Sequence, residues 1–296
     1  MPDTINLKYN IMNRVFSFLI SFVLIVALTN CAQDANRNAK ISPDTISAEP
    51  EVQNTENEVD IDDGSIPIFY NMYLTVEMSS LFESIDAVYE EDYINPASKT
   101  SEYIMSSEMA TNLGVYAVDL SYVNVFEKYD KAGSYLSAMH QLSEDLGIPG
   151  DHFYETVSRF EDNINDRDSL YAIANEIYVT TDTYLNENGR EGSAALIILG
   201  GWIEAMHIAT AMVRDGLKDP VLLEKIADQS ESLENLIELL EKHKENEIIA
   251  EYLTQLKNIL QPMNSVTVDY DNPTPAIQQI IAIGDKISAI RNQIIN

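Results

Sequence analysis

The chain has 296 residues, with 18 Lys and Arg against 48 Asp and Glu, and carries a formal charge of −30 at pH 7. Nucleic acid and anionic membrane surfaces would repel so acidic a body, so we expect no nucleic-acid partner. The charge is typical of a solvated surface that maintains solubility. An acidic docking face for a basic partner is the alternative interpretation.

The first thirty residues have the pattern of an export signal. Lys8 and Arg14 precede an apolar run over residues 15–28 that only two serines interrupt. The run is shorter than the roughly 20 residues that a membrane-spanning helix needs. It therefore predicts a signal peptide over residues 1–30. Translation from Met12 is the alternative start, with which the chain would begin Met-Asn-Arg directly before the run.

The only cysteine, Cys31, follows this run in the sequence Leu28-Thr29-Asn30-Cys31. These residues resemble the lipobox of bacterial lipoproteins, although Asn30 stands where that family usually has glycine or alanine. The resemblance implies that Cys31 carries acyl chains, palmitate among them, and that two or more chains anchor the protein stably. Ala32 and Asp34 fit an outer-membrane destination better than inner-membrane retention. With one cysteine, no intramolecular disulfide can form.

Residues 31–64 predict an acidic, disordered tether. They are poor in large apolar side chains and rich in Asn, Asp, Glu, Ser and Pro. Such a stretch cannot bury enough apolar surface to offset the entropy lost on ordering. The folded domain is therefore expected over residues 65–296.

This domain is predicted to be all-α, a single bundle of about eight or nine helices, because helical periodicity dominates and no useful alternating strand pattern occurs. Asp219-Pro220 is a helix start, with an N-cap acceptor before a first-turn proline. Five isoleucines near the C-terminus are spaced three and four residues apart, so they form one apolar helix face. This face is expected to pack in the core of the monomer or at an oligomeric interface. The expected helices span 66–91, 99–129, 132–146, 151–163, 167–187, 192–215, 220–243, 246–261 and 275–295.

The helix expected over 192–215 is apolar on every side except at Glu204 and His207. We interpret it as an interior helix, because an ionisable pair in its middle argues against a membrane span. Glu204 and His207 lie three residues apart and share a face. Glu-x-x-His is also half of the motif of di-metal carboxylate bundles, but the chain has no second copy, and we expect no metal and no cofactor. A ligand or catalytic site and a structural buried pair both remain open. In the structural case a tyrosine, an arginine or His207 itself would satisfy Glu204.

Asp119 interrupts an otherwise apolar stripe on the helix expected over 99–129. A carboxyl group in this position should be buried and have a raised pKa. If it met Glu204, the two would form a carboxyl pair of the kind used in acid–base chemistry. Hydrogen bonding between helices is the alternative role.

Tyr116, Tyr122 and Trp202 complete the candidate ligand-binding residues, since aromatic side chains line pockets for sugars and flat ligands. Core packing is the alternative. The chain contains none of the glycine-rich phosphate-binding motifs and no Gly-x-Ser-x-Gly motif.

The segments Tyr116–Tyr122 (YAVDLSY) and Gly201–Glu204 (GWIE) resemble sequences of the uncharacterised all-helical lipoproteins of Bacteroidota. The resemblance implies an all-helical, lipid-anchored protein of the cell envelope and no particular activity. We therefore expect a non-enzymatic domain that binds a small ligand or a protein partner. The alternative is an enzyme or metal-binding bundle built on Glu204, His207 and Asp119.

Overall fold

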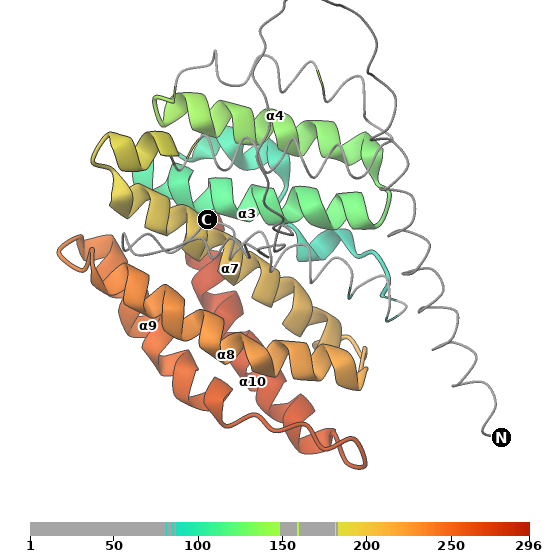
Figure 1. Ribbon diagram of the computed structural model, residues 1–296. Helices are drawn as coiled ribbons and strands as arrows, with labels where there is room; N and C mark the ends of the chain where they lie inside the picture. Colours follow the sequence, from blue (N-terminus) through green and yellow to red (C-terminus); the bar gives the residue numbers. More distant parts are fainter. Residues whose placement is uncertain (1–80, 82–84, 86, 149–158, 160–180, 182) are drawn as a thin grey trace, which may run out of the picture. The chain divides into compact units, whose positions relative to one another are not determined.

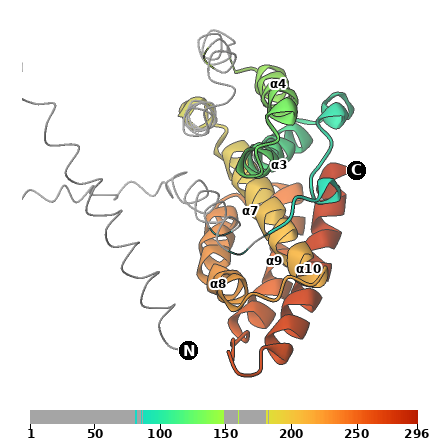
Figure 2. The ribbon, with the colours of Figure 1, turned by 90° about the vertical axis from the view of Figure 1, so that its right-hand side faces the viewer.

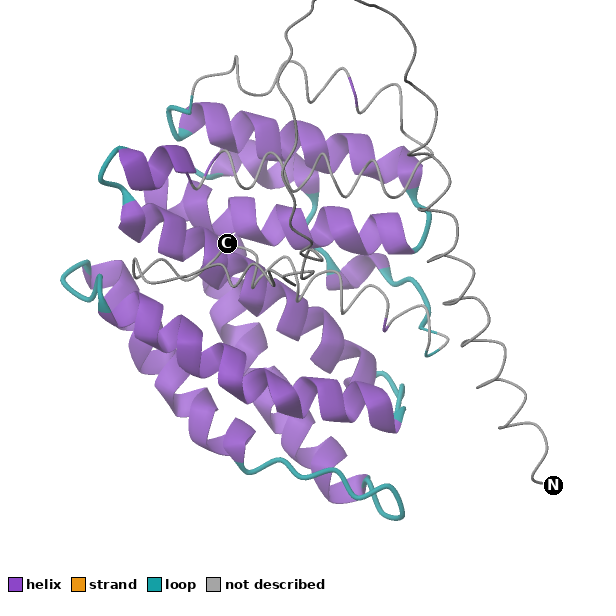
Figure 3. Ribbon diagram, in the orientation of Figure 1, coloured by secondary structure: helices purple, strands orange, loops and turns teal. Residues whose placement is uncertain are grey.

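The computed structural model describes residues 81, 85, 87–148, 159, 181 and 183–296, all within the unit Asp60–Asn296. This part is all-α, as predicted, and contains no strand (Figure 3). The predicted signal peptide and tether lie outside the described residues. The helical elements are η1 (Glu91–Tyr93), η2 (Ala97–Glu102), α3 (Ser106–Val125), α4 (Tyr129–Asp145), α7 (Glu191–Arg214), α8 (Pro220–Glu241), α9 (Glu247–Asn264) and α10 (Thr274–Ile295).

Helix α7 is the centre of the packing. It contacts α3 on one side and α8 and α10 on the other, as Figures 1 and 2 show in two views. It is long and apolar enough to cross a membrane, but 83% of its apolar window is buried inside the protein. The position agrees with the prediction of an interior helix, because a helix that is apolar on all sides buries most surface when neighbours surround it.

Glycines allow α3 and α7 to touch backbone to backbone. A Cβ atom on Gly200 would lie 1.9 Å from the carbonyl oxygen of Thr111, and one on Gly114 would lie 2.0 Å from that of Ile197. Gly200 thus faces Thr111, one turn before Gly114, and Gly114 faces Ile197, one turn before Gly200. No other residue type fits at Gly114 or Gly200 without moving the helices apart.

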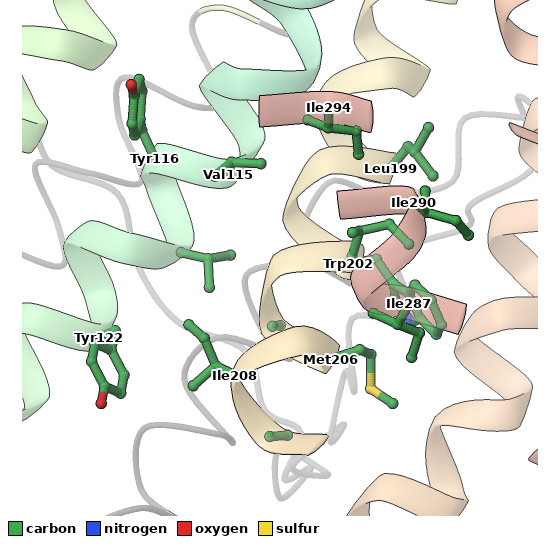
Figure 4. Packing of buried hydrophobic residues seen from close by; sticks show 14 of the residues in the cluster. Val115, Tyr116, Tyr122, Leu199, Trp202, Met206, Ile208, Ile287, Ile290 and Ile294 are labelled. Carbon is green, nitrogen blue, oxygen red and sulfur yellow. The ribbon is translucent and has the colours of Figure 1, made fainter. Parts of the chain in front are cut away.

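Helix α10 packs on α7 through its isoleucines. Figure 4 shows Trp202 of α7 directed toward Ile287 and Ile290 of α10, and all three side chains are buried. A Cβ atom on Gly284 would lie 2.8 Å from the side chain of Thr210, so α10 also approaches α7 closely. The predicted isoleucine face is therefore buried within one copy of the chain. Its members are Ile280, Ile283, Ile287, Ile290 and Ile294.

Helices α8 and α9 pack on each other and on α10, and α8 also packs on α7. Helix α8 starts as predicted: Asp219 Oδ1 accepts a hydrogen bond of 2.8 Å from Val221 N, and Pro220 occupies the first turn, where its missing N–H is not needed. Helix α9 extends to Asn264, past the predicted end at residue 261.

The predicted helices over 132–146, 192–215, 220–243, 246–261 and 275–295 correspond to α4, α7, α8, α9 and α10. The prediction over 66–91 is wrong at its end, because residues 87–90 have no regular structure and only Glu91–Tyr93 form a 3-10 turn. The prediction over 99–129 is wrong at both ends: Tyr103 is extended, and a turn with Glu127 at φ 55° separates α3 from α4.

The helices predicted over 151–163 and 167–187 lie largely outside the described residues. Of these positions, 159, 181 and 183–187 are described, and they are helical.

The glycine contact predicts very different effects for two neighbouring substitutions. Gly200→Ala should lower the free energy of unfolding by about 3 kcal/mol or more, because the new methyl group would overlap the Thr111 backbone. Gly201→Ala is the matched control, since its Cβ would meet nothing closer than 3.6 Å, and it should be neutral or stabilising by up to about 1 kcal/mol. Urea unfolding measures both. Equal losses in the two variants would contradict the close crossing.

Candidate functional site

Three helices bring Asp119, Glu204 and Arg291 together in the core; we call these residues the polar cluster. Arg291 of α10 donates two hydrogen bonds to the carboxylate of Glu204 of α7, from Nε to Oε2 at 2.6 Å and from Nη2 to Oε1 at 2.7 Å. All three residues are buried. Paired N–H···O bonds to a carboxylate are among the strongest side-chain contacts in proteins. An arginine is therefore the partner of Glu204, one of the possibilities that the sequence left open.

Asp119 of α3 lies near Glu204 in the core, and both side chains are fully buried. Its Oδ2 atom accepts a hydrogen bond of 3.1 Å from the backbone N–H of Asn95. Its Oδ1 atom has no hydrogen-bond partner among the described residues. Two buried carboxyl groups near one guanidinium leave a surplus negative charge unless one of them carries a proton.

Of the two carboxyl groups, Asp119 is the one whose surroundings favour the protonated form. Both oxygens of Glu204 accept N–H donors from Arg291, whereas Asp119 has no charged donor. Burial and the nearby charge of Glu204 raise the pKa of Asp119 well above its usual range, although Arg291 acts in the opposite direction. The raised pKa agrees with the prediction from the apolar stripe. With Asp119 neutral, the polar cluster holds one negative and one positive charge.

The close crossing of α3 and α7 explains why the two carboxyl groups lie near each other. Asp119 lies five residues after Gly114, and Glu204 lies four residues after Gly200, so both carboxyl groups follow the glycine contact by about one helical turn. A larger residue at either glycine would separate the helices at this point. The packing of Gly284 on Thr210 similarly brings α10, and with it Arg291, against α7.

The segment Glu90–Pro96, which contains the 3-10 turn η1 and no α-helix, contacts the polar cluster; we call it the connecting segment. Its backbone is held by side chains of the core. Arg291 Nη2 donates to the carbonyl oxygen of Tyr93 at 3.1 Å, and Asn95 N donates to Asp119. Tyr93 Oη also donates to Asp215 Oδ2 at 2.6 Å. These contacts replace internal hydrogen bonds that an α-helix would supply.

The buried tyrosines serve the same segment. Tyr122 Oη accepts a bond of 2.8 Å from Glu90 N and donates to Glu90 O at 3.3 Å. Tyr116 Oη donates to Pro96 O, and Tyr135 Oη donates to Asn95 O, both at 3.1 Å. The sequence marked Tyr116 and Tyr122 as candidate ligand contacts. The structure shows both bound to the protein's own backbone.

Trp202 and His207 lie apart from the polar cluster's hydrogen bonds. Trp202 is buried against α10, on the side away from Tyr116 and Tyr122 (Figure 4). His207 Nδ1 lies 3.1 Å from Ser288 Oγ of α10. Burial lowers the pKa of His207 to about 4, despite the opposing effect of Glu204, so the ring is neutral at pH 7. The predicted site residues thus lie in three places: in the polar cluster, against the backbone of the connecting segment, and against α10.

Within the described ranges, no group of three or more His, Cys, Asp or Glu side chains is placed to hold a metal ion. The residues that the structure adds to the sequence prediction are Arg291, Asn95 and the peptide groups of the connecting segment. Arg291 had a signal in the sequence: it lies four residues after Ile287 and next to Ile290, on a helix face that is otherwise apolar.

Searches against protein-family models, curated proteins and solved structures find no match for this chain.

Removing Arg291 should be far more damaging than removing an exposed arginine. Arg291→Met should lower the free energy of unfolding by about 3–5 kcal/mol, because it leaves Glu204 charged and unpaired in the core. Arg214→Met is the matched control: Arg214 pairs with Asp285 at 2.8 Å at the surface, and its loss should be below about 1 kcal/mol. Denaturant unfolding measures both, and similar losses would contradict a buried, interdependent cluster.

Proposed function

We propose that this chain is a lipid-anchored helical protein of a bacterial cell envelope that binds a small ligand or a protein partner and catalyses no reaction. The observation that carries the proposal is the position of Cys31, directly after the apolar run 15–28 and in the lipobox-like sequence Leu28–Cys31. A charged flank, a run of signal-peptide length and a cysteine at its end agree with one another. Acyl chains on Cys31 would hold the domain at a membrane, for which we propose the outer membrane.

The closed polar cluster supports binding over catalysis. The hydrogen-bonding groups of Glu204 and Arg291 are used by each other and by the connecting segment, and Asp119 accepts from Asn95. A substrate would have to displace Arg291 or the connecting segment to reach either carboxyl group. A catalytic acid or base must lie within hydrogen-bond reach of its substrate. The cluster therefore fits a structural role, and the ligand or partner is expected at the surface.

One surface feature suits a small ligand. A groove of about 510 Å³ lies between η2 and α4, a volume within the range of ligand sites. Its polar side chains are hydroxyl and amide groups, without an ionisable residue, on a chain whose net charge is −30. Such a lining suits an uncharged, polar ligand, for which hydroxyl groups both donate and accept. The polar residues are Ser98, Thr100, Ser101, Ser134, Ser137 and Gln141.

The alternative is an enzyme or metal-binding bundle that uses Glu204, His207 and Asp119. The proximity of Asp119 and Glu204 favours it, since carboxyl pairs with one proton perform acid–base chemistry in other proteins. The position of His207 disfavours it, because the ring contacts Ser288 and no hydrogen bond joins it to either carboxyl group in the described part of the chain. The enzyme or metal-binding bundle is therefore our second hypothesis.

Mass spectrometry of the full chain, extracted from membranes in mild detergent, tests the proposal. Under denaturing conditions the processed protein should retain the mass of acyl chains, and Cys31→Ser should remove that mass and release the protein from membranes. Asn30→Gly, which restores the residue usual in a lipobox, is the control and should remain acylated. A wild-type protein without acyl mass, or membrane association that persists in Cys31→Ser, would contradict the anchor.

The same spectra under native conditions test the binding site. A non-covalent mass excess should disappear in Ser134→Trp, which fills the groove, and should persist in Thr254→Trp, which alters another exposed hydroxyl residue on α9. Glu204→Gln should retain the excess wherever it folds. An excess that is lost in folded Glu204→Gln and kept in Ser134→Trp would contradict the groove and favour the alternative site.

A further inference from the structure

The polar cluster contains an odd number of ionisable groups: two carboxyl groups face one guanidinium. If both carboxyl groups were ionised, the cluster would hold a surplus negative charge in the core, where an uncompensated charge is strongly unfavourable. Arg291 is paired with Glu204, so Asp119 is the carboxyl group without a charged partner. Asp119 is fully buried, and its Oδ1 atom has no hydrogen-bond partner in the described part of the chain, so a proton on Asp119 relieves this problem. The hydrogen bond from Asn95 N to Asp119 is compatible with either form of Asp119.

We propose that a proton on the buried Asp119 is a latch, which keeps the connecting segment closed over the core and whose loss opens that segment to water. An ionised Asp119 needs hydration, and water can reach it by displacing either a packed helix or the connecting segment. The helices α3, α7 and α10 are continuous around the cluster, whereas the connecting segment has only the single 3-10 turn η1. Opening the connecting segment is therefore the smaller structural change.

The neighbouring ionisable groups leave Asp119 as the group that titrates. Burial raises the pKa of each tyrosine near the cluster, so these side chains stay neutral through the neutral range. His207 on α7 is already neutral, since burial lowers its pKa to about 4. Arg291 on α10 remains charged. The tyrosines are Tyr93 in the connecting segment, Tyr103 next to Asn95 of that segment, Tyr116 and Tyr122 on α3, and Tyr135 on α4; Tyr89, whose pKa is raised to about 12, lies beside Tyr122.

The direction of the pH effect follows from the raised pKa of Asp119. An unfolded chain releases this proton near pH 4, whereas the folded protein holds it to higher pH. Between these two values the folded state binds one more proton than the unfolded state. The closed form therefore loses stability as the pH rises, by up to about tenfold in its equilibrium constant per pH unit. The stability that this proton contributes to the closed form is fully present below the pKa that Asp119 has in the unfolded chain. Paired surface carboxylates act in the opposite direction.

Hydrogen–deuterium exchange of the full chain tests the latch. Between mildly acidic and alkaline pH, the protection factors of amides in residues 88–96, corrected for the intrinsic pH dependence, should fall by at least tenfold. Protection in α9, which carries none of the three cluster residues, should change much less and is the internal control. Constant protection of residues 88–96 across this range would overturn the proposal, as would a parallel loss in α9, which indicates global unfolding.

Asp119→Asn provides the matched variant. Its side-chain carbonyl oxygen can accept from Asn95 N and its amide is neutral, so it reproduces the protonated carboxyl group without the ability to ionise. In this variant residues 88–96 should stay protected at alkaline pH. The same pH-dependent loss in Asp119→Asn and wild type would overturn the latch. If the variant fails to fold, the comparison of residues 88–96 with α9 in wild type still decides.

Discussion

The buried contact between Glu204 and Arg291 is the interaction on which the described part of the fold depends. Removing two charges from water is unfavourable by several kcal/mol for each ion, and mutual attraction offsets this only when the remaining donors and acceptors are also satisfied. Here both carboxylate oxygens are bound, and Arg291 uses a further N–H for the carbonyl oxygen of Tyr93. The pair therefore specifies one arrangement of α7, α10 and the connecting segment, because any other arrangement would leave a charge unpaired in the apolar core.

The glycines at the crossing of α3 and α7 make a second carboxyl group part of this arrangement. Backbone contact at Gly114 and Gly200 holds α3 against α7 about one turn before Asp119 and Glu204, and it brings Asp119 near Glu204 in the core. Its neutrality then becomes a condition of the closed fold. Packing, charge and protonation are thus linked in one small region. The groups that resemble catalytic machinery are used to hold the chain in place, while the hydroxyl-lined groove between η2 and α4 remains open at the surface.

The periodicity of apolar residues was enough to predict which helix faces are buried. The apolar surface of residues 192–215 indicated an interior helix, the isoleucine spacing indicated the buried face of α10, and the stripe around Asp119 indicated a buried carboxyl group. The pairing of Glu204 with Arg291 spans 87 positions and depends on how helices cross, which periodicity does not reveal. The helix predicted over 66–91 included only the first two residues of the connecting segment, and the contacts of that segment were not predicted, because propensity takes no account of side chains from α3, α4 and α10 that bind its backbone.

The most direct test of this account is the infrared spectrum of the folded protein at neutral pH, recorded as the difference between wild type and Asp119→Asn. A protonated carboxyl group and an ionised carboxylate absorb at clearly separate frequencies. The account predicts that wild type shows the C=O band of a buried, protonated carboxyl group and that Asp119→Asn lacks it. Loss of a carboxylate signal in the variant, with no protonated band in wild type, would show that Asp119 is ionised in the core and would contradict the account.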